Sequence, residues 1–168
     1  IMRRLFEQNK IRKTIDLNGK WKFKLDPDNI GKDEGWWKGW NNAEEVIVPS
    51  CWNNELRLLN YEGAAWYQRE FEITEEDGSP DLLFNFDSVM TKADVWIDNT
   101  FMCEHYGAFT GFSFITSVGP GVHTLTVRVD NIFEKYSFPQ RYTDWFNYGG
   151  IARDVLFSKL YGISILDN

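Results

Sequence analysis

Short runs of alternating apolar and polar residues follow one another along almost the whole chain. A period of two places every second side chain on the same face of a β-strand, so such runs predict strands with one face in a core. Because these runs are many and short, they restrict the chain to an all-β fold. The predicted strands cover residues 21–25, 67–73, 82–87, 94–98 and 124–130, followed by the apolar runs 155–160 and 163–166.

Turn-forming residues separate the predicted strands. Asp98-Asn99 predicts a tight hairpin, because both residue types tolerate positive φ angles. The segments Glu76–Pro80 and Gly119–Gly121 are two further breaks. Strands this short, with turns this frequent, predict an antiparallel β-sandwich of two stacked sheets, of jelly-roll type.

One stretch has helical spacing. Trp36, Trp37 and Trp40 are spaced as on one helix face, and Asp33 is expected to cap a short helix there. These rings belong to an unusually large aromatic share of 17%, with eight tryptophans. Tryptophan also stacks on sugar rings, but we interpret most of these side chains as core, because aromatic residues dominate protein interiors.

The totals argue against several functions. The net charge of −7 argues against a nucleic-acid partner, which requires a basic face. The chain has no run of 18 apolar residues, which argues against a membrane partner. Cys51 and Cys103 match no metal spacing and are predicted to be buried free thiols. No metal and no other cofactor is expected.

The length and the two ends of the chain suggest its context. A length of 168 residues favours one domain, taken here as residues 1–168. Residues 2–10 lack the apolar segment of a signal peptide, so a soluble protein is expected, cytoplasmic unless a signal peptide was removed for periplasmic or secreted targeting. Ile1 ahead of Met2, and a strand-like end at residues 163–168, suggest a fragment of a longer chain.

The segment Asp144–Val155 is the leading candidate for a binding site. It combines a carboxylate, three aromatic rings, an amide, adjacent glycines and an arginine in twelve residues, just before an apolar strand. Aromatic faces beside short polar groups suit a sugar, and loops on a rigid scaffold often carry binding residues. The sequence therefore predicts a sugar-facing loop here.

Catalytic groups are harder to find. Glycosidic cleavage usually requires two carboxyl groups flanking the bond. Glu44-Glu45 and Glu75-Glu76-Asp77 are interpreted as solvated charges, and Glu70 and Glu72 as the polar face of a strand. The two possible imidazole bases are His105 and His123; we interpret His123 as a surface strand residue and His105 as a hydrogen-bonded structural residue, with a ligand contact as the alternative. The residues alone indicate a non-catalytic β-sandwich.

Five segments, in the same order, resemble glycoside hydrolase family 2 and especially its β-glucuronidases. The resemblance covers about residues 14 to 166, and five motifs in register make it specific. The segments are Leu17–Phe23 ("L-x-G-x-W-x-F"), Val48–Asn53 ("V-P-G-S-x-N"), Asn60–Arg69 ("G-x-x-W-Y-Q-R"), Val95–Phe109 ("V-W-V-N-x…H-x-G-G-Y") and Asp144–Val155.

The resemblance implies a jelly-roll sugar-binding domain that precedes an immunoglobulin-like domain and a catalytic (β/α)8 barrel. The catalytic glutamates of the family lie in that barrel, so this chain alone is expected to be inactive. Asp144 matches the aspartate that hydrogen-bonds hydroxyls of the substrate sugar. The alternative is a loop carboxylate that pairs with Arg141 or Arg153. Asn147 and Tyr148 are expected mainly to shape the loop and pack on the barrel, with a contact to the substrate sugar as the alternative. Gly149, Gly150 and Arg153 are expected to be structural loop residues. A homo-oligomer of the parent enzyme is also compatible with the resemblance.

The sequence also departs from the family pattern. The segment Tyr136–Thr143 is shorter than usual, and Gly149 stands where alanine is usual. Arg153 and Asp154 are interpreted as a pair that fixes the loop, and with Val155 they equally fit the β-galactosidases of the family. Glucuronide and galactoside therefore both remain open. Two other readings also stay open: a free-standing carbohydrate-binding module and a purely structural β-sandwich.

Overall fold

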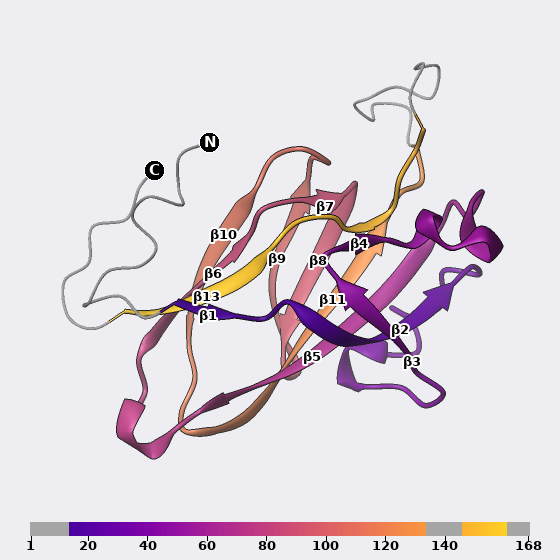
Figure 1. Cartoon of the computed structure of the whole chain (residues 1–168). Helices are drawn as coiled ribbons and strands as arrows, with labels where there is room; N and C mark the ends of the chain where they lie inside the picture. The colour runs from indigo at the N-terminus through magenta and orange to yellow at the C-terminus, as the bar shows by residue number, and fades with distance from the viewer. Residues whose placement is uncertain (1–13, 134–145, 161–168) are drawn as a thin grey trace.

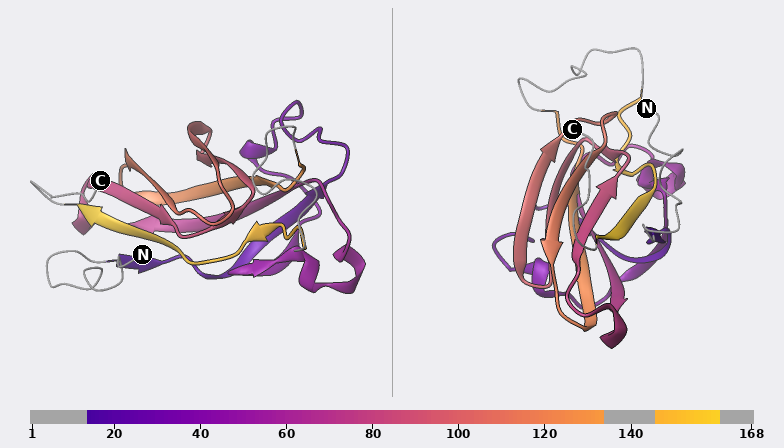
Figure 2. Two further views of the ribbon diagram at one scale, coloured as in Figure 1. Left: turned by 90° about the horizontal axis from the view of Figure 1, so that it is seen from above. Right: turned by 90° about the vertical axis from the view of Figure 1, so that its left-hand side faces the viewer.

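The computed structural model describes residues 14–133 and 146–160. Two antiparallel sheets stack face to face, and a short three-stranded sheet joins them (Figures 1 and 2). The predicted antiparallel β-sandwich of jelly-roll type is thus confirmed. The four-stranded sheet has the order β1 (Thr14–Asp16), β13 (Val155–Leu160), β6 (Asp81–Phe86), β10 (Phe112–Ser117). The six-stranded sheet has the order β3 (Glu44–Val48), β2 (Gly19–Asp26), β5 (Ala64–Ile73), β11 (Gly121–Asp130), β8 (Lys92–Ile97), β9 (Thr100–Tyr106), and the short sheet joins β4 (Ser50–Cys51), β12 (Gly150–Ile151) and β7 (Val89–Met90).

The core between the two large sheets is built by the predicted alternation. Trp21 and Phe23 of β2 and Phe84 and Phe86 of β6 are each at most 1% exposed. Phe84 stacks on Phe157 of β13 with ring centroids 5.2 Å apart. The predicted strand at residues 163–166 lies outside the described residues.

The outer face of the six-stranded sheet is also buried, which the alternation did not predict. Asp94 and Trp96 of β8 lie on the face opposite the core residues Val95 and Ile97, yet they are only 1% and 6% exposed. The chain between β2 and β3 folds back over this face and adds Trp36 to a ring cluster with Trp66 and Trp96. A period of two reports which side chains share a face, but it cannot report that a distant segment covers that face.

The segment that covers this face contains little helix. Trp36–Lys38 form a single 3₁₀ turn, η2, and Gly35 with φ 69° precedes it without a side-chain cap, so the predicted capping role of Asp33 is wrong. The anchor is Asp26, whose buried carboxylate accepts hydrogen bonds from the backbone N–H of Ile30 (2.8 Å) and Gly31 (3.0 Å) and from Trp66 Nε1 (2.9 Å).

Buried charges fasten the same segment to the sheet. Arg128 of β11 is 3% exposed, and its guanidinium donates to Asp94 Oδ2 (3.2 Å), Asp130 Oδ2 (2.6 Å) and Asn29 Oδ1 (2.7 Å). Lys32 Nζ lies 2.8 Å from Asp94 Oδ2. Charges this deeply buried require partners, and the loop between β2 and η2 supplies two of them.

The sandwich has two different ends. At the hairpin end lie the turn η5 (Glu75–Asp77), the predicted hairpin of Asp98-Asn99 between β8 and β9, and the Gly119–Gly121 turn. The hairpin prediction is confirmed, and Asp98 has φ 52°. At the loop end, β2, β9 and β11 finish and β5 and β8 begin. The turns η3 (Trp52–Asn54) and η4 (Leu56–Leu58) lie at this end, far from η5 (Figure 1).

Candidate functional site

The predicted sugar-facing loop reaches the loop end of the sandwich. Asp144, its key residue, lies outside the described residues, which resume at Phe146. Asn147 is half-buried, whereas Phe146 and Tyr148 are 41% and 43% exposed. The rings of Phe146 and Tyr148 pack on each other with centroids 5.0 Å apart.

Three asparagine side chains hold this loop, and we call them the asparagine framework: Asn53, Asn131 and Asn147. Asn147 Nδ2 donates to the carbonyl oxygen of Asn131 (2.8 Å), and Asn131 Nδ2 lies 3.4 Å from the carbonyl oxygen of Asn147. Asn131 Oδ1 accepts from the backbone N–H of Gly63 (2.9 Å). Asn53 Oδ1 accepts from the backbone N–H of Gly149 (2.8 Å).

The donors of Asn53 complete the framework. Its Nδ2 lies 3.1 Å from the carbonyl oxygens of both Leu58 and Leu59 and 3.4 Å from that of Tyr61. An amide suits such a position because it carries donors and an acceptor on one side chain. The framework therefore joins the η3–η4 segment, the end of β11 and the loop at 146–149 into one unit.

The packing explains why position 149 is glycine. A Cβ built on Gly149 would lie 1.8 Å from the Trp52 ring, so the indole fills the space of a methyl group. Trp52 is 3% exposed, and its backbone N–H donates to the carbonyl oxygen of Gly149 (2.9 Å). Gly150 has φ 132°, and a Cβ there would lie 2.6 Å from the carbonyl oxygen of Ser50.

The predicted pairing of Arg153 with Asp154 is wrong. Among the described residues, no ion pair joins the two side chains, and Arg153 is exposed. Asp154 Oδ1 instead accepts from Asn18 Nδ2 (3.1 Å), and Asn18 Oδ1 accepts from the backbone N–H of Val155 (3.1 Å). Neighbouring residues on an extended chain point to opposite faces, so the partner comes from the β1–β2 link.

His105 is occupied within its own turn. Its Nε2 lies 3.3 Å from the carbonyl oxygen of Gly107 and 3.2 Å from that of Thr110. Both oxygens are acceptors, so Nε2 carries the proton. The ring stacks on Phe112 with centroids 4.4 Å apart. This geometry supports the structural interpretation of His105, because its donor already serves the 107–110 turn.

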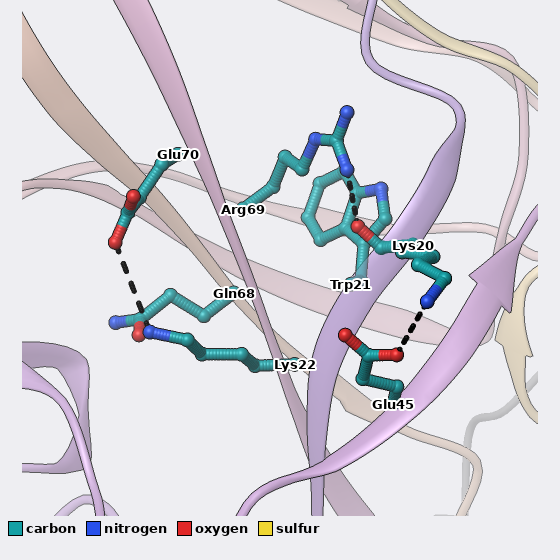
Figure 3. Close-up of a pocket in the computed structure, with 7 residues that line it drawn as sticks. All are labelled: Lys20, Trp21, Lys22, Glu45, Gln68, Arg69 and Glu70. Atoms are coloured by element: carbon teal, nitrogen blue, oxygen red, sulfur yellow. Dashed lines mark hydrogen bonds and ion pairs between the residues drawn. The ribbon is translucent and has the colours of Figure 1, made fainter.

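A shallow groove lies elsewhere, where β2 and β5 separate (Figure 3). Its volume is about 330 Å³. Lys20 pairs with Glu45 (2.9 Å), Lys22 approaches Glu70 (3.7 Å), and Arg69 donates to the carbonyl oxygen of Lys20. The charges lining the groove are thus used by one another, and its chemistry indicates no ligand.

Other chemistry is also limited in the part of the chain that the structure describes. No group of three or more metal-ligating side chains occurs among residues 14–133 and 146–160. Cys51 and Cys103 are free, as predicted, but half-buried, and burial raises the pKa of the Cys103 thiol to about 11. No helix within those ranges is long and apolar enough to cross a membrane.

The sequence reasoning missed two of the three framework residues. Asn53 closes the "V-P-S-C-W-N" motif and Asn131 follows the β11 strand directly, so both stood in recognisable places. No local signal tells that both side chains hold the same loop, because they are separated by 78 positions and reach Gly149 and Asn147 only in the folded chain. Glu62, whose Oε1 lies 3.5 Å from Asn147 Nδ2, was also missed as a neighbour of the loop.

Comparison with known proteins gives β-glucuronidases and a β-galactosidase as relatives. The chain is 27% identical over 190 residues to a β-glucuronidase of Paenibacillus borealis, covering 97% of this chain and 32% of that protein. It is 27% identical to a β-galactosidase of Thermoanaerobacter pseudethanolicus, covering 90% of this chain and 20% of that protein. The chain therefore spans about a third or less of the length of these relatives.

A solved structure gives the same picture. The β-glucuronidase of Ruminococcus gnavus in complex with D-glucuronic acid superposes with a TM-score of 0.84 at 26% identity, over 91% of this chain and 30% of that chain. The family model described as the sugar binding domain of glycosyl hydrolases family 2 matches residues 14–161. Because this match contains the whole described sandwich, the chain belongs to the sugar-binding domain family of the family 2 glycosyl hydrolases.

Proposed function

We propose that this chain is the non-catalytic sugar-binding domain of a retaining β-glycosidase of the β-glucuronidase type. In this proposal Asp144 contributes a carboxylate to the subsite that holds the substrate sugar, and the rest of the loop packs on the catalytic domain. The cleavage itself follows the two-carboxylate route of retaining enzymes, on residues outside this chain. A β-glucuronide is favoured over a β-galactoside because the structural match at TM-score 0.84 is a β-glucuronidase.

The observation that carries the proposal is the anchoring of the loop by the asparagine framework. Asn147 stands three residues after Asp144 and is tied to Asn131 by a hydrogen bond of 2.8 Å. A carboxylate that must meet sugar hydroxyls needs a fixed loop, because binding loses free energy when a floppy segment is ordered. An ionised carboxylate only accepts hydrogen bonds, so Asp144 can serve two adjacent hydroxyl groups.

The carboxylates that the structure describes support a non-catalytic role. Glu44 is bound to Arg57, which lowers the pKa of Glu44 mainly through that hydrogen bond. Glu45 is paired with Lys20 across the β2–β3 edge. Side chains held as exposed ion pairs at a sheet edge do not flank a bound substrate, so these groups offer no acid and nucleophile.

The alternative, a free-standing carbohydrate-binding module, depends on exposed tryptophan faces. None of the seven tryptophans in the described ranges is exposed, and five of them are buried: Trp21, Trp36, Trp52, Trp66 and Trp96. Trp37 and Trp40 are half-buried against the same outer-face cluster. The predicted core role of most tryptophans is confirmed, and no observation favours the alternative.

The test uses the full-length polypeptide that the proposal implies. Asp144→Ala should lower kcat/KM for an aryl β-glucuronide by about 10- to 100-fold, because a hydrogen bond to a charged group contributes roughly 1.5–3 kcal/mol. Glu76→Ala, which removes an exposed carboxylate at the hairpin end, is the matched control and should leave kcat/KM unchanged. Equal kcat/KM values for the Asp144 variant and wild type would remove Asp144 from the subsite, and turnover by the purified 168-residue chain would refute the non-catalytic assignment.

A further inference from the structure

The link between β1 and β2 contains the only Asn-Gly dipeptide of the sequence, Asn18-Gly19. An asparagine loses its side-chain amide most readily before glycine, because glycine has no side chain to shield its backbone nitrogen from the neighbouring amide carbon. A Cβ built on Gly19 would meet no heavy atom within 4 Å, so the space beside this residue is open as well. The link therefore carries a chemically labile amide.

Both ends of the Asn18 amide fasten this link to β13. Asn18 Nδ2 donates to Asp154 Oδ1 (3.1 Å), and Asn18 Oδ1 accepts from the backbone N–H of Val155 (3.1 Å). We call these three residues the amide latch. Directly before the latch, the backbone N–H of Leu17 donates to the carbonyl oxygen of Val155 (2.9 Å), and β1 pairs with β13 (Figure 1). The latch thus joins the first described strand to the strand that follows the candidate site.

We propose that Asn18 is a site of spontaneous deamidation, and that the reaction converts the amide latch into two facing carboxylates that no longer hold the link. The backbone nitrogen of Gly19 attacks Cγ of Asn18 and forms a new C–N bond, and the side-chain nitrogen leaves as ammonia with the proton of the Gly19 N–H. Water then opens the succinimide ring, at Cγ to give aspartate or at the main-chain carbonyl carbon to give isoaspartate. One water is consumed, and a neutral carboxamide is replaced by a carboxylate.

The product does not fit the closed latch. An oxygen replaces Nδ2 and faces Asp154 Oδ1 at the position of the present 3.1 Å hydrogen bond. A carboxylate has only acceptors, so a donated hydrogen bond is exchanged for contact between two negative charges. In isoaspartate the backbone is also one carbon longer, which displaces the acceptor of the Val155 N–H. Both products therefore weaken the attachment of the link to β13.

The same hydrogen bonds determine when the reaction takes place. While the latch is closed, its two hydrogen bonds hold the Asn18 amide in one orientation, so cyclisation follows an opening of the β1–β2 link. β1 contains three residues and lies at the edge of its sheet, and such elements open at a lower free energy than central strands. Deamidation in the open state then prevents reclosure, which makes a local and reversible opening irreversible.

The first experiment measures the rate of deamidation in the 168-residue chain. Wild type and variants are incubated in mildly alkaline buffer, and mass spectrometry follows the peptide that contains residues 18 and 19, with the exposed Asn99 as the internal reference. Asp154→Ala removes the acceptor of Nδ2 and should accelerate deamidation of Asn18 by about 10-fold, because a hydrogen bond to a charged group no longer opposes opening. Asn131→Ala, which leaves the latch intact, is the matched control and should change the rate by no more than about twofold.

The second experiment separates the new charge from the loss of the amide. Asn18→Asp reproduces the deamidated side chain on an unaltered backbone and should lower the midpoint of thermal unfolding by about 5 °C. Adding Asp154→Asn to the same chain should recover most of this loss, because the exchanged pair again contains one amide and one carboxylate.

Three results would overturn the proposal. An Asn18 that deamidates no faster than Asn99 in the Asp154→Ala variant would show that the dipeptide is not labile in this chain. Equal acceleration by Asp154→Ala and Asn131→Ala would assign the reaction to global unfolding instead of opening of the link. An Asn18→Asp chain as stable as wild type, or a double variant as unstable as Asn18→Asp, would show that the product carboxylate does not disrupt the latch.

Discussion

The two ends of this sandwich are closed by different chemistry. At the hairpin end the turns are closed by charged groups: Thr74 and Asp77 form a capping box, Lys159 pairs with Asp77, and Asp98 binds His123. At the loop end neutral amides of the asparagine framework join the segments, and the surface beside them is apolar.

The difference between the two ends bears on which of them contacts a partner. At the hairpin end, the charged groups that close the turns are paired with one another. The neutral amides of the asparagine framework satisfy the buried backbone beside residues 146–149 without adding a charge of their own. Another domain can then cover the apolar side chains beside the framework without desolvating a charge of the framework itself. The comparison therefore supports the proposal that binding takes place at the loop end, whereas the ion pairs of the hairpin end close its turns.

The largest expected effect is at Gly149, where the loop end depends on close packing. Gly149→Ala places a methyl group in the Trp52 ring, because the built Cβ lies only 1.8 Å from it. The variant should lose about 3 kcal/mol of unfolding free energy, at the upper end of the usual effect of overpacking. Chemical denaturation of the 168-residue chain measures this.

A second substitution sharpens the Gly149 prediction. Trp52→Phe combined with Gly149→Ala should recover much of the loss, because the smaller ring leaves room for the methyl group. Additive losses in the double variant would show that the ring and the glycine are not coupled. Gly119→Ala is the matched control, since Gly119, like Gly149, has no left-handed φ, and the heavy atom nearest to its Cβ position is Ser79 Oγ at 3.9 Å.

The next largest effect is expected at Asn131, the residue of the asparagine framework that binds Asn147. Asn131→Ala removes the acceptor of the Gly63 N–H and both donors of the amide, and should destabilise the 168-residue chain by about 2–3 kcal/mol, because buried backbone groups lose their partner. Asn131→Asp keeps the acceptor and should lose less. Asn99→Ala, at an exposed amide of the hairpin end, should change the unfolding free energy by less than about 0.5 kcal/mol. Equal losses at Asn131 and Asn99 would contradict the contrast between the ends.

The smallest effect is a pH dependence confined to the hairpin end. His123 Nδ1 lies 2.9 Å from Asp98 Oδ2 and its Nε2 lies 2.8 Å from the carbonyl oxygen of Gly119. Both partners accept, so the geometry requires the doubly protonated imidazolium. Partial burial lowers the pKa of His123, but the hydrogen bonds to Asp98 and Gly119 and the charge of Asp98 outweigh it, and the pKa lies above its ordinary value.

Because the pKa is raised in the folded state, the stabilisation is complete below the unfolded pKa of about 6.5 and disappears as the pH rises through the folded pKa. Wild type should therefore be more stable than Asp98→Asn by at most about 1 kcal/mol at pH 5.5, and the two should converge at pH 9. Asparagine tolerates the positive φ at position 98, so the turn is kept. A difference in unfolding free energy that stays constant from pH 5.5 to pH 9 would refute the stabilising ion pair between His123 and Asp98.

Much of the fold could be predicted from the sequence, because its information is local. The alternation at Trp21 and Phe23 and the hairpin at Asp98 follow from a period of two and from turn chemistry. The covered outer face could not be predicted in the same way. Asp94 alternates like a solvent-facing residue, and its burial depends on Lys32 and Arg128 arriving from other segments.

In the candidate site, too, the local residue pattern could be predicted, whereas the contacts between distant segments could not. The motif at residues 144–155 was recognisable as a string of residue types. What holds it was not, because Asn53 and Asn131 meet Gly149 and Asn147 only through the fold. The wrong expectation at Arg153 has the same cause: adjacency in sequence suggested a pair, whereas Asp154 hydrogen-bonds Asn18 from the other end of the described chain.

The most direct test of the central claim pairs Asp144 with the sugar hydroxyls. The full-length polypeptide and its Asp144→Asn variant would be assayed with an aryl β-glucuronide and with analogues that each lack one hydroxyl group. If Asp144 binds a hydroxyl, the ratio of wild-type to variant kcat/KM should be about 10 or more on the parent substrate and fall toward one on at least one deoxy analogue. The same ratio on every substrate would contradict the account, since Asp144 would then act without touching the sugar.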